Sequence, residues 1–245
     1  MTGTAIVTGG ARGLGRAYCL ALSDAGFRVV VSDLLDGQSV AYEIAQAGGE
    51  AIYVTADISS AEDNVALASA AADAFGSIDV LINNAAYFSE TTRGPFFEVP
   101  EMEWDRTFEV NVRGVWLSCS AVYPYMREQG SGKIINIASN TCFKGTVGFP
   151  HYVASKSAVI GLTRCLAQEL GPDGITVNTV SPDLIPDPSL RPADSTSDEF
   201  VVAGRALKRT QVPEDMIGTI LYLASSGADF VTGQNILVNG GAHYH

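Results

Sequence analysis

The sequence has few basic residues and no long apolar run. Its 15 Lys and Arg stand against 27 Asp and Glu, which gives a formal net charge of −12. Because so acidic a surface repels a phosphate backbone, we expect no nucleic-acid partner. No stretch approaches the roughly 20 apolar residues that span a bilayer, so we expect no membrane association. The residues before position 8 lack a basic region and are typical of a first strand rather than a signal peptide.

Cysteine is also scarce. Cys19, Cys119, Cys142 and Cys165 show no C-x-x-C spacing, and three of them lie in segments with a helical pattern. Without a zinc-type or redox pair, buried thiols in a reducing cytoplasm are the expected state. The sequence therefore predicts a cytoplasmic protein without a bound metal.

Short apolar runs rich in branched residues alternate with longer helical patterns. We predict strands at 5–8, 28–32, 51–55, 79–82, 133–138, 175–180 and 235–238, and helices at 14–25, 61–75, 102–128, 152–170 and 213–224. With no linker between halves, we expect a single domain over residues 1–245. The alternation predicts an α/β fold, a three-layer doubly wound Rossmann sheet of about seven parallel strands with helices on both faces.

One stretch, residues 182–208, breaks this alternation. Four prolines, at positions 182, 186, 188 and 192, precede a polar run at 194–199. Long loops in compact domains are often functional, and this one follows the sixth predicted strand. We predict a substrate lid at about residues 183–210.

A glycine-rich run, Thr8-Gly9-Gly10-Ala11-Arg12-Gly13-Leu14-Gly15, joins the first predicted strand to the first predicted helix. In that context the backbone N–H groups and the helix dipole can hold a pyrophosphate, and the missing side chains allow close approach. Gly9, Gly13, Leu14 and Gly15 are therefore candidate contacts of a dinucleotide. A helix start that needs flexible residues is the alternative explanation.

Asp33 ends the second predicted strand, eighteen residues beyond Gly15. A carboxylate at this spacing accepts hydroxyls of the adenosine ribose and repels a 2′-phosphate, which favours NAD. Arg12 in the glycine loop is able to grip such a phosphate, so NADP is the alternative. Three further candidates follow the third and fourth strands at the ligand-binding edge of the sheet: Asp57, Ile58 and Asn84.

Tyr152 and Lys156 are one helical turn apart, and Ser139 precedes Tyr152 by thirteen residues. Residues at i and i+4 share a helix face, so the Lys156 ammonium can lie beside the Tyr152 phenol. A positive neighbour favours the phenolate, which makes Tyr152 a candidate general base. The Ser139 hydroxyl can donate to a developing alkoxide.

Together these motifs resemble the short-chain dehydrogenase/reductase family, in its compact single-domain branch. The match covers nearly the whole chain and includes, in order, the glycine loop, Asn84, Asn111, Ser139 and the Tyr152/Lys156 pair. The resemblance implies Tyr152 as acid/base, and Lys156 as the residue that lowers the Tyr152 pKa and holds the nicotinamide ribose. It implies that Ser139 orients the substrate oxygen and that Asn111 bends its helix around a water linked to the lysine.

The chain departs from the family after the sixth predicted strand. The family usually has Pro-Gly there, whereas Pro182 is followed by Asp183, which puts a backbone contact to the nicotinamide amide in question. The aspartate is also expected to reshape the substrate mouth. The Ile185 backbone is still carried over as a candidate for holding the carboxamide, and Asp187 stands where the family has Thr.

The residues around Ser139 suggest an apolar, aromatic substrate pocket, with Thr141, Phe143, Phe149 and Tyr152 as candidate substrate contacts beside Ser139. No Arg or Lys stands out as an anchor for an anionic group. His151 is expected to be an exposed residue at a helix start.

A weaker resemblance to NAD-dependent dehydrogenases of 1-phenylethanol-type alcohols and of pyridoxal favours hydride transfer between NAD(H) and a secondary or aromatic alcohol, ketone or aldehyde. An NADPH-dependent 3-oxoacyl thioester reductase shares every catalytic motif and is the alternative enzyme. A dinucleotide-sensing regulator without turnover is the alternative from another class. By family analogy we expect a homotetramer, with the helices that begin near Met102 and Tyr152 paired between subunits.

Overall fold

The computed structural model describes residues 3–88, 91–186 and 195–244. In these residues seven strands form one parallel sheet in the order β3-β2-β1-β4-β5-β6-β7. The strands are β1 Thr4–Thr8, β2 Arg28–Asp33, β3 Ala51–Thr55, β4 Val80–Asn83, β5 Gly132–Ile137, β6 Ile175–Pro182 and β7 Asn235–Val238. The predicted doubly wound Rossmann architecture is confirmed.

Helices connect the strands. They are α1 Gly13–Asp24, α2 Gln38–Gln46, α3 Ala61–Phe75, α4 Glu101–Phe108, the π-helix η2 Glu109–Gly114, α5 Val115–Gln129, α6 Thr141–Lys144, α7 Pro150–Leu170, α8 Ser195–Ala203 and α9 Glu214–Leu223. Short 3₁₀ turns are η1 Phe96–Glu98, η3 Gly171–Asp173 and η4 Ser226–Ala228. No helix in the described ranges is both long enough and apolar enough to cross a membrane.

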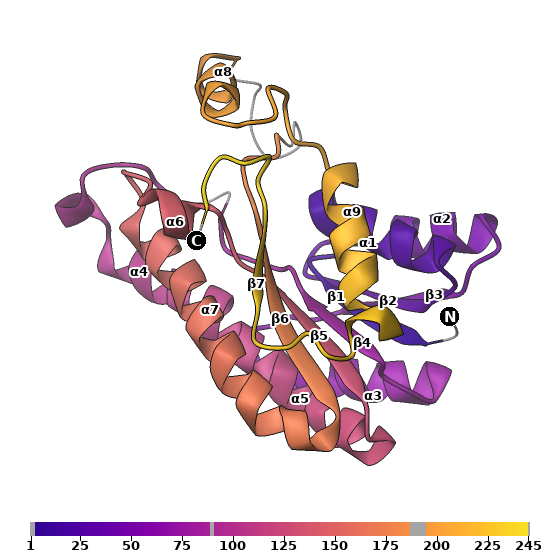
Figure 1. Ribbon diagram of the computed structural model, residues 1–245. Helices are drawn as coiled ribbons and strands as arrows, with labels where there is room; N and C mark the ends of the chain where they lie inside the picture. Colours follow the sequence, from indigo (N-terminus) through magenta and orange to yellow (C-terminus); the bar gives the residue numbers. More distant parts are fainter. Residues whose placement is uncertain (1–2, 89–90, 187–194, 245) are drawn as a thin grey trace.

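Both faces of the sheet are buried because its residues alternate between two apolar clusters. Ala5 and Val7 of β1 pack on one side with α1, α2 and α9, whereas Ile6 packs on the other with α3, α5 and α7. This period of two follows from strand geometry, and it explains why the strands are near-continuous apolar runs. Figure 1 shows the resulting three layers, with α8 standing beyond the end of the sheet.

The strand order reverses beside β1, which pairs with β2 on one side and with β4 on the other. In parallel α/β sheets, ligands bind outside the carboxyl ends of the strands at such a switch point. The glycine loop leaves β1 there, Asp33 ends β2, and the segments with Ser139 and Asp183 follow β5 and β6. The fold thus gathers residues far apart in sequence at one edge.

The predicted elements that formed are correct to within two residues at their ends. Helix α2 was not predicted, because its buried face consists of three residues only, Val40, Ala41 and Ile44. The helix predicted at 102–128 is interrupted by η2. The lid, predicted as an irregular loop, contains the helix α8, while Asp187 and the rest of 187–194 lie outside the described residues.

Two predictions about burial were wrong. His151 is fully buried rather than exposed, because the start of α7 packs against α4. Cys165, expected to be buried, is exposed on α7, whereas Cys19 and Cys119 are buried; all four cysteines are free thiols. Periodicity finds the buried face of a helix but does not show where a neighbouring helix covers a second face.

Candidate active site

The glycine loop forms a cradle that side chains would fill. Gly9 has φ +66°, a conformation that favours glycine, and a Cβ there would lie 2.9 Å from Ala85 Cα. A Cβ on Gly15 would collide with the Gly9 carbonyl oxygen. Helix α1 begins at Gly13 without a side-chain cap, so its first N–H groups can face a phosphate. This chemistry fits the pyrophosphate of a dinucleotide.

Asp33 lies beside this cradle. Its carboxylate accepts hydrogen bonds from Ala11 N at 3.0 Å and from Leu35 N at 3.0 Å. A carboxylate has about four lone-pair directions, so acceptor capacity remains for ribose hydroxyls. Arg12 is exposed, and it precedes the first residue of α1.

The other cofactor candidates lie along the same edge. Asn84 holds the glycine loop, since its Nδ2 donates to the carbonyl oxygens of Thr8 and Gly9 at 3.1 Å each. Leu14 and Ile185 both pack, half-buried, against the apolar cluster that includes α1. Asn84 thus has a visible scaffold role, whatever further contact it makes.

Asp57 and Ile58 follow β3. The Asp57 carboxylate accepts from the N and Oγ of Ser59 at 2.8 and 2.6 Å and lies 3.4 Å from Arg106 Nη2. Burial raises the Asp57 pKa, but the Ser59 and Arg106 contacts outweigh it, so the pKa is lowered. Ile58 is buried close to Gly114. Arg106 therefore connects this edge to α4.

The structure brings Ser139, Tyr152 and Lys156 together. All three are buried, Ser139 just after β5 and the other two in the first turns of α7. The Lys156 Nζ donates to Ile137 O at 2.7 Å and lies 5.9 Å from the centre of the Tyr152 ring. Ser139 Oγ accepts from Thr141 N and Oγ1 at 3.2 and 2.9 Å. The predicted proximity of phenol, ammonium and hydroxyl is therefore present.

The protein chain alone does not lower the pKa of Tyr152. Burial raises it strongly, and the side-chain hydrogen bond with Ser139 offsets only part of this effect. Burial also lowers the Lys156 pKa to about 8. In the chain alone, desolvation thus outweighs the hydrogen bond with Ser139, and the pKa of Tyr152 is raised.

Asn111 lies in the π-helix η2, where the helix between α4 and α5 is distorted. Its Oδ1 accepts from Tyr87 N at 2.7 Å, and its Nδ2 donates to Tyr87 O at 3.2 Å and to Ser155 Oγ at 3.1 Å. Ser155 belongs to α7, between Tyr152 and Lys156. Asn111 therefore joins the loop after β4 to α7. π-Helical turns of this kind are frequent at functional sites.

Aromatic rings surround Tyr152. The ring of Phe88 lies 4.7 Å and the ring of Phe149 lies 5.4 Å from it, centre to centre. Phe149 is buried, whereas Thr141 and Phe143 are half-buried on α6. The exposed Arg93 guanidinium covers the Phe149 ring at 4.7 Å, a cation near these rings that the sequence did not single out. Arg93 lies far from Phe149 in the sequence. The backbone brings the two residues together, because Gly94 N donates to Gly148 O.

Two charged contacts near the site were not visible in the sequence. His151 Nε2 lies 3.0 Å from Glu103 Oε1, without hydrogen-bond geometry, and Glu103 also accepts from Thr92 N and Oγ1. The Asp183 side chain is buried and paired with Lys144 and Arg205. The partners of His151 and Asp183 belong to other elements of the fold. In the sequence, only the unusual residue Asp183 pointed to such a contact.

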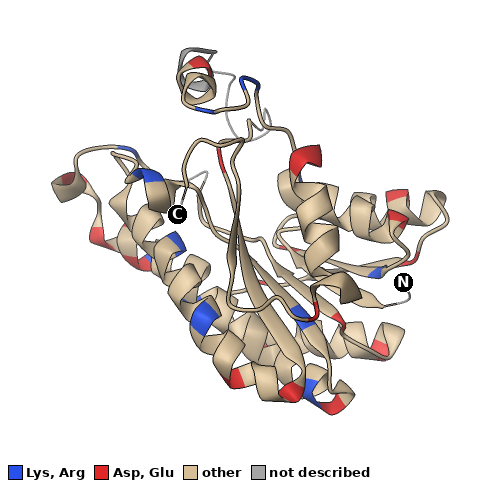
Figure 2. Ribbon diagram, in the orientation of Figure 1, with Lys and Arg blue, Asp and Glu red and all other residues tan. Residues whose placement is uncertain are grey.

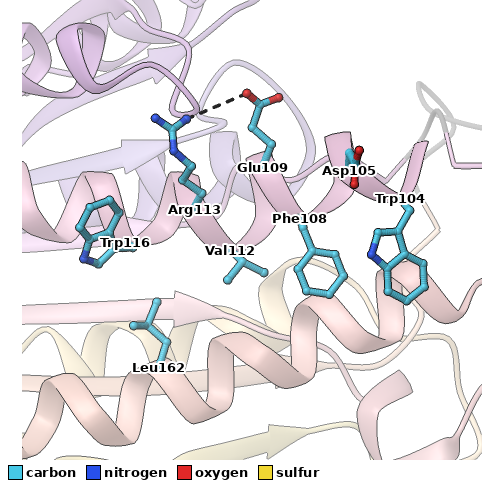
Figure 3. Close-up of a pocket in the computed structure, with 8 residues that line it drawn as sticks. All are labelled: Trp104, Asp105, Phe108, Glu109, Val112, Arg113, Trp116 and Leu162. Carbon is cyan, nitrogen blue, oxygen red and sulfur yellow. Dashed lines mark ion pairs between the residues drawn. The ribbon is translucent and has the colours of Figure 1, made fainter. Parts of the chain in front are cut away.

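The described residues contain no group of His, Cys, Asp and Glu that could hold a metal ion. An open groove of about 690 Å³ lies away from the chemistry, between α4, η2, α5 and α7. Figure 3 shows Phe108 and Val112 pointing toward the helix that carries Leu162, whereas Glu109 and Arg113 point away from it. Trp104 and Trp116, both exposed, line the two ends of this groove.

Comparison with known proteins gives full-length matches. A family profile described as enoyl-(acyl carrier protein) reductase matches residues 9–243. The 3-oxoacyl-(acyl-carrier-protein) reductase FabG of Staphylococcus aureus is 36% identical over 253 aligned positions, covering 99% of both chains. The FabG of Staphylococcus epidermidis is 35% identical and covers 99% of this chain and 100% of its own. The 3-alpha-(or 20-beta)-hydroxysteroid dehydrogenase of Mycobacterium tuberculosis is 38% identical and covers 97% and 88%.

Proposed function

The chain belongs to the short-chain dehydrogenase/reductase family of oxidoreductases, and from this premise we propose that it interconverts a 3-oxoacyl and a 3-hydroxyacyl group using a nicotinamide dinucleotide. The observation that carries the proposal is the buried group of Ser139, Tyr152 and Lys156 beside the glycine cradle. The names of the relatives favour the 3-oxoacyl thioester over the secondary or aromatic alcohol expected from the sequence.

The residues divide the chemistry among them. When bound, the dinucleotide supplies or accepts the hydride. In the reducing direction the Tyr152 hydroxyl gives its proton to the substrate oxygen, and the Ser139 hydroxyl donates to the same oxygen as negative charge develops. Lys156 stands beside the phenol, and the Asn111–Ser155 contact holds the helix that carries both.

The test is a comparison of substrates with wild-type protein. We expect oxidation of the reduced dinucleotide with a 3-oxobutanoyl thioester, and kcat/KM at least about tenfold higher than with acetophenone, a difference of about 1.4 kcal/mol in transition-state binding. Higher kcat/KM with acetophenone would reject the thioester assignment. Dinucleotide binding without turnover of either compound would favour the regulatory alternative.

A secondary or aromatic alcohol is the second candidate substrate. The Phe88 and Phe149 rings around Tyr152 and the similarity to a hydroxysteroid dehydrogenase support it. Oxidation of 1-phenylethanol in the same assay tests this candidate directly.

For the cofactor we propose NAD(H). The support is the position of Asp33, whose half-buried carboxylate stands beside the glycine loop and would face a 2′-phosphate with like charge. Titration with NADH and NADPH tests the proposal, and tighter binding of NADPH would overturn it.

We propose that the protein is a cytoplasmic homotetramer. In this tetramer a second copy of the chain covers the groove of Figure 3. Trp104 and Trp116 expose apolar surface along it, more than isolated surface residues need. Light scattering on Trp116→Glu should give a smaller particle than wild type, while Tyr42→Glu, which changes a more exposed aromatic on α2, should not.

A further inference from the structure

A carboxylate and two cations lie together where β6 ends. Asp183 Oδ1 accepts from Lys144 Nζ at 2.7 Å and from Asn140 Nδ2 at 3.1 Å, and Oδ2 accepts from Arg205 Nε at 2.9 Å. The side chains of Asp183 and Arg205 are 4% and 2% exposed. Unlike a surface ion pair, this cluster is shielded from water and salt, so its geometry is held tightly.

The cluster joins three segments of the chain. Lys144 ends α6, which begins two residues after Ser139, and Asp183 follows the last residue of β6. Arg205 follows the end of α8 by two residues and belongs to the part of the lid described here, residues 199–208, which we call the lid segment. We call residues 139–144, from Ser139 to Lys144, the serine loop. One carboxylate thus connects the serine loop, the sheet and the lid segment.

Arg205 extends the connection along the lid segment. Its Nη2 donates to Leu184 O at 2.8 Å and its Nη1 donates to Arg209 O at 3.0 Å. The fork geometry of the guanidinium therefore ties Leu184, just after β6, to Arg209, just after the lid segment. Arg205 and the carboxylate that orients it hold the lid segment together with a backbone bond, in which Leu207 N donates to Gly240 O at 2.9 Å.

The sheet side of the cluster is itself anchored. Asp183 N donates to Gln211 Oε1 at 3.1 Å, and Gln211 Nε2 donates to Val238 O at the end of β7 at 2.7 Å. Asn140 Oδ1 accepts from Asn239 Nδ2 at 3.0 Å. Because these contacts do not involve the carboxylate, the frame remains when the charge of Asp183 is removed.

Charge explains why the carboxylate is needed. Lys144 and Arg205 carry two positive charges against the single negative charge of Asp183. Burial raises the pKa of Asp183, but the hydrogen bonds from Lys144, Asn140 and Arg205 outweigh it and hold the pKa below its ordinary value. Without that carboxylate, the buried Arg205 and the partly buried Lys144 would repel each other across the gap between serine loop and lid segment.

We propose that Asp183 is a positioning residue, which holds the lid segment against the serine loop and so fixes the substrate side of the active site. The proposal rests on the proposed hydride transfer, since its kinetic readout needs a carbonyl substrate. Asp183 stands where the family resemblance implies glycine. The link that it makes between the serine loop and the lid segment is therefore a feature of this chain rather than of the motif. It acts through Lys144 and Arg205 and need not touch the reacting atoms.

The experiment uses three variants. Asp183→Asn removes the charge and keeps the shape. Lys144→Met removes the more exposed cation and keeps the length of the side chain. The matched control is Asp229→Asn, because Asp229 Oδ1 accepts from Lys133 Nζ at 2.6 Å, a similar contact remote from Ser139 at the other end of β5.

For Asp183→Asn we expect KM for the 3-oxobutanoyl thioester to rise about tenfold, kcat to fall less than about threefold, and the dinucleotide Kd to stay within about twofold. Amide exchange of the lid segment, residues 199–208, should quicken about tenfold relative to wild type. Lys144→Met should shift both quantities in the same direction by about threefold, and Asp229→Asn should shift neither.

Unchanged KM and unchanged exchange in a folded Asp183→Asn protein would overturn the proposal. So would an equal loss of substrate and dinucleotide binding, which indicates a general structural role. If Asp183→Asn does not fold, Lys144→Met decides by the same two readouts. If wild-type protein reduces no carbonyl compound, the proposed function fails, and the exchange rates alone decide whether Asp183 holds the lid segment.

Discussion

Two aspartates lie at the same edge of the sheet, Asp33 at the end of β2 and Asp183 just after β6, with β1, β4 and β5 between the two strands. Asp33 is half-buried and accepts only from backbone N–H groups, those of Ala11 and Leu35. Asp183 is buried and accepts from Lys144, Arg205 and Asn140. The charge of Asp33 is thus available to a ligand, whereas the charge of Asp183 is already used within the protein.

The difference shows how one residue type serves two ends of an active site. A carboxylate with neutral partners keeps its negative potential and can select between ligands by charge. A carboxylate between two cations loses that potential and instead fixes geometry. Figure 2 shows the acidic positions scattered along helices and loops in many parts of the ribbon, so neither role follows from net charge.

The largest expected effect concerns the centre that both carboxylates serve. Tyr152→Phe should lower turnover about 10³-fold, or about 4 kcal/mol, because the proton donor to the substrate oxygen is lost. Dinucleotide binding should remain. Steady-state kinetics and fluorescence titration measure the two quantities, and Tyr123→Phe, far from the site on α5, is the control. Turnover retained in Tyr152→Phe would refute the acid/base role.

The next effect compares the stability contributed by the buried side chain of Asp183 with that contributed by the exposed Asp229. Asp183→Leu should lower the free energy of unfolding by about 3 kcal/mol, since it leaves the buried Arg205 and the partly buried Lys144 without their anionic partner. Removing the Lys133–Asp229 contact by Asp229→Asn should cost about 1 kcal/mol or less, because Asp229 is largely exposed. Urea unfolding followed by circular dichroism gives both values. Equal losses would show that burial makes no difference here.

A smaller effect tests the selectivity assigned to Asp33. Asp33→Asn keeps the size of the side chain and removes the charge, so the ratio of NADPH to NADH affinity should rise about tenfold, or about 1.4 kcal/mol. The same ratio in Asp183→Asn should stay near its wild-type value. If both variants shifted the ratio alike, the contrast between a ligand-reading and a positioning carboxylate would fail.

The smallest effect is expected with pH. The folded pKa of Asp183 is lowered, so its stabilising contribution is complete above its ordinary unfolded pKa of about 3.9 and is lost as the pH falls through the lower folded value. The difference in unfolding free energy between wild type and Asp183→Leu should therefore be constant from about pH 5 to 8. Urea titrations across this range check it; a difference that grew toward pH 8 would contradict the assigned partners.

The fold was predictable because burial on both faces of a parallel sheet leaves long apolar runs, as in β1 and β2. The proximity of Tyr152 and Lys156 was predictable because helical spacing alone sets it. The distortion at Asn111 came only from the family resemblance, since no local pattern marks a π-turn. The burial that raises the pKa of Tyr152 in the chain alone could not be predicted, because it depends on residues that pack around the phenol only in the folded protein.

By itself the sequence determined the alternation of strands and helices, the glycine cradle and the proximity of Tyr152 and Lys156, because each depends on residues close together along the chain. Only the tertiary structure decided what Asp183 does, since its partners Lys144 and Arg205 lie 39 and 22 residues away. The physical reason is that local periodicity fixes backbone conformation, whereas the strength and sign of an electrostatic contact depend on distance and burial, which exist only once the chain has packed.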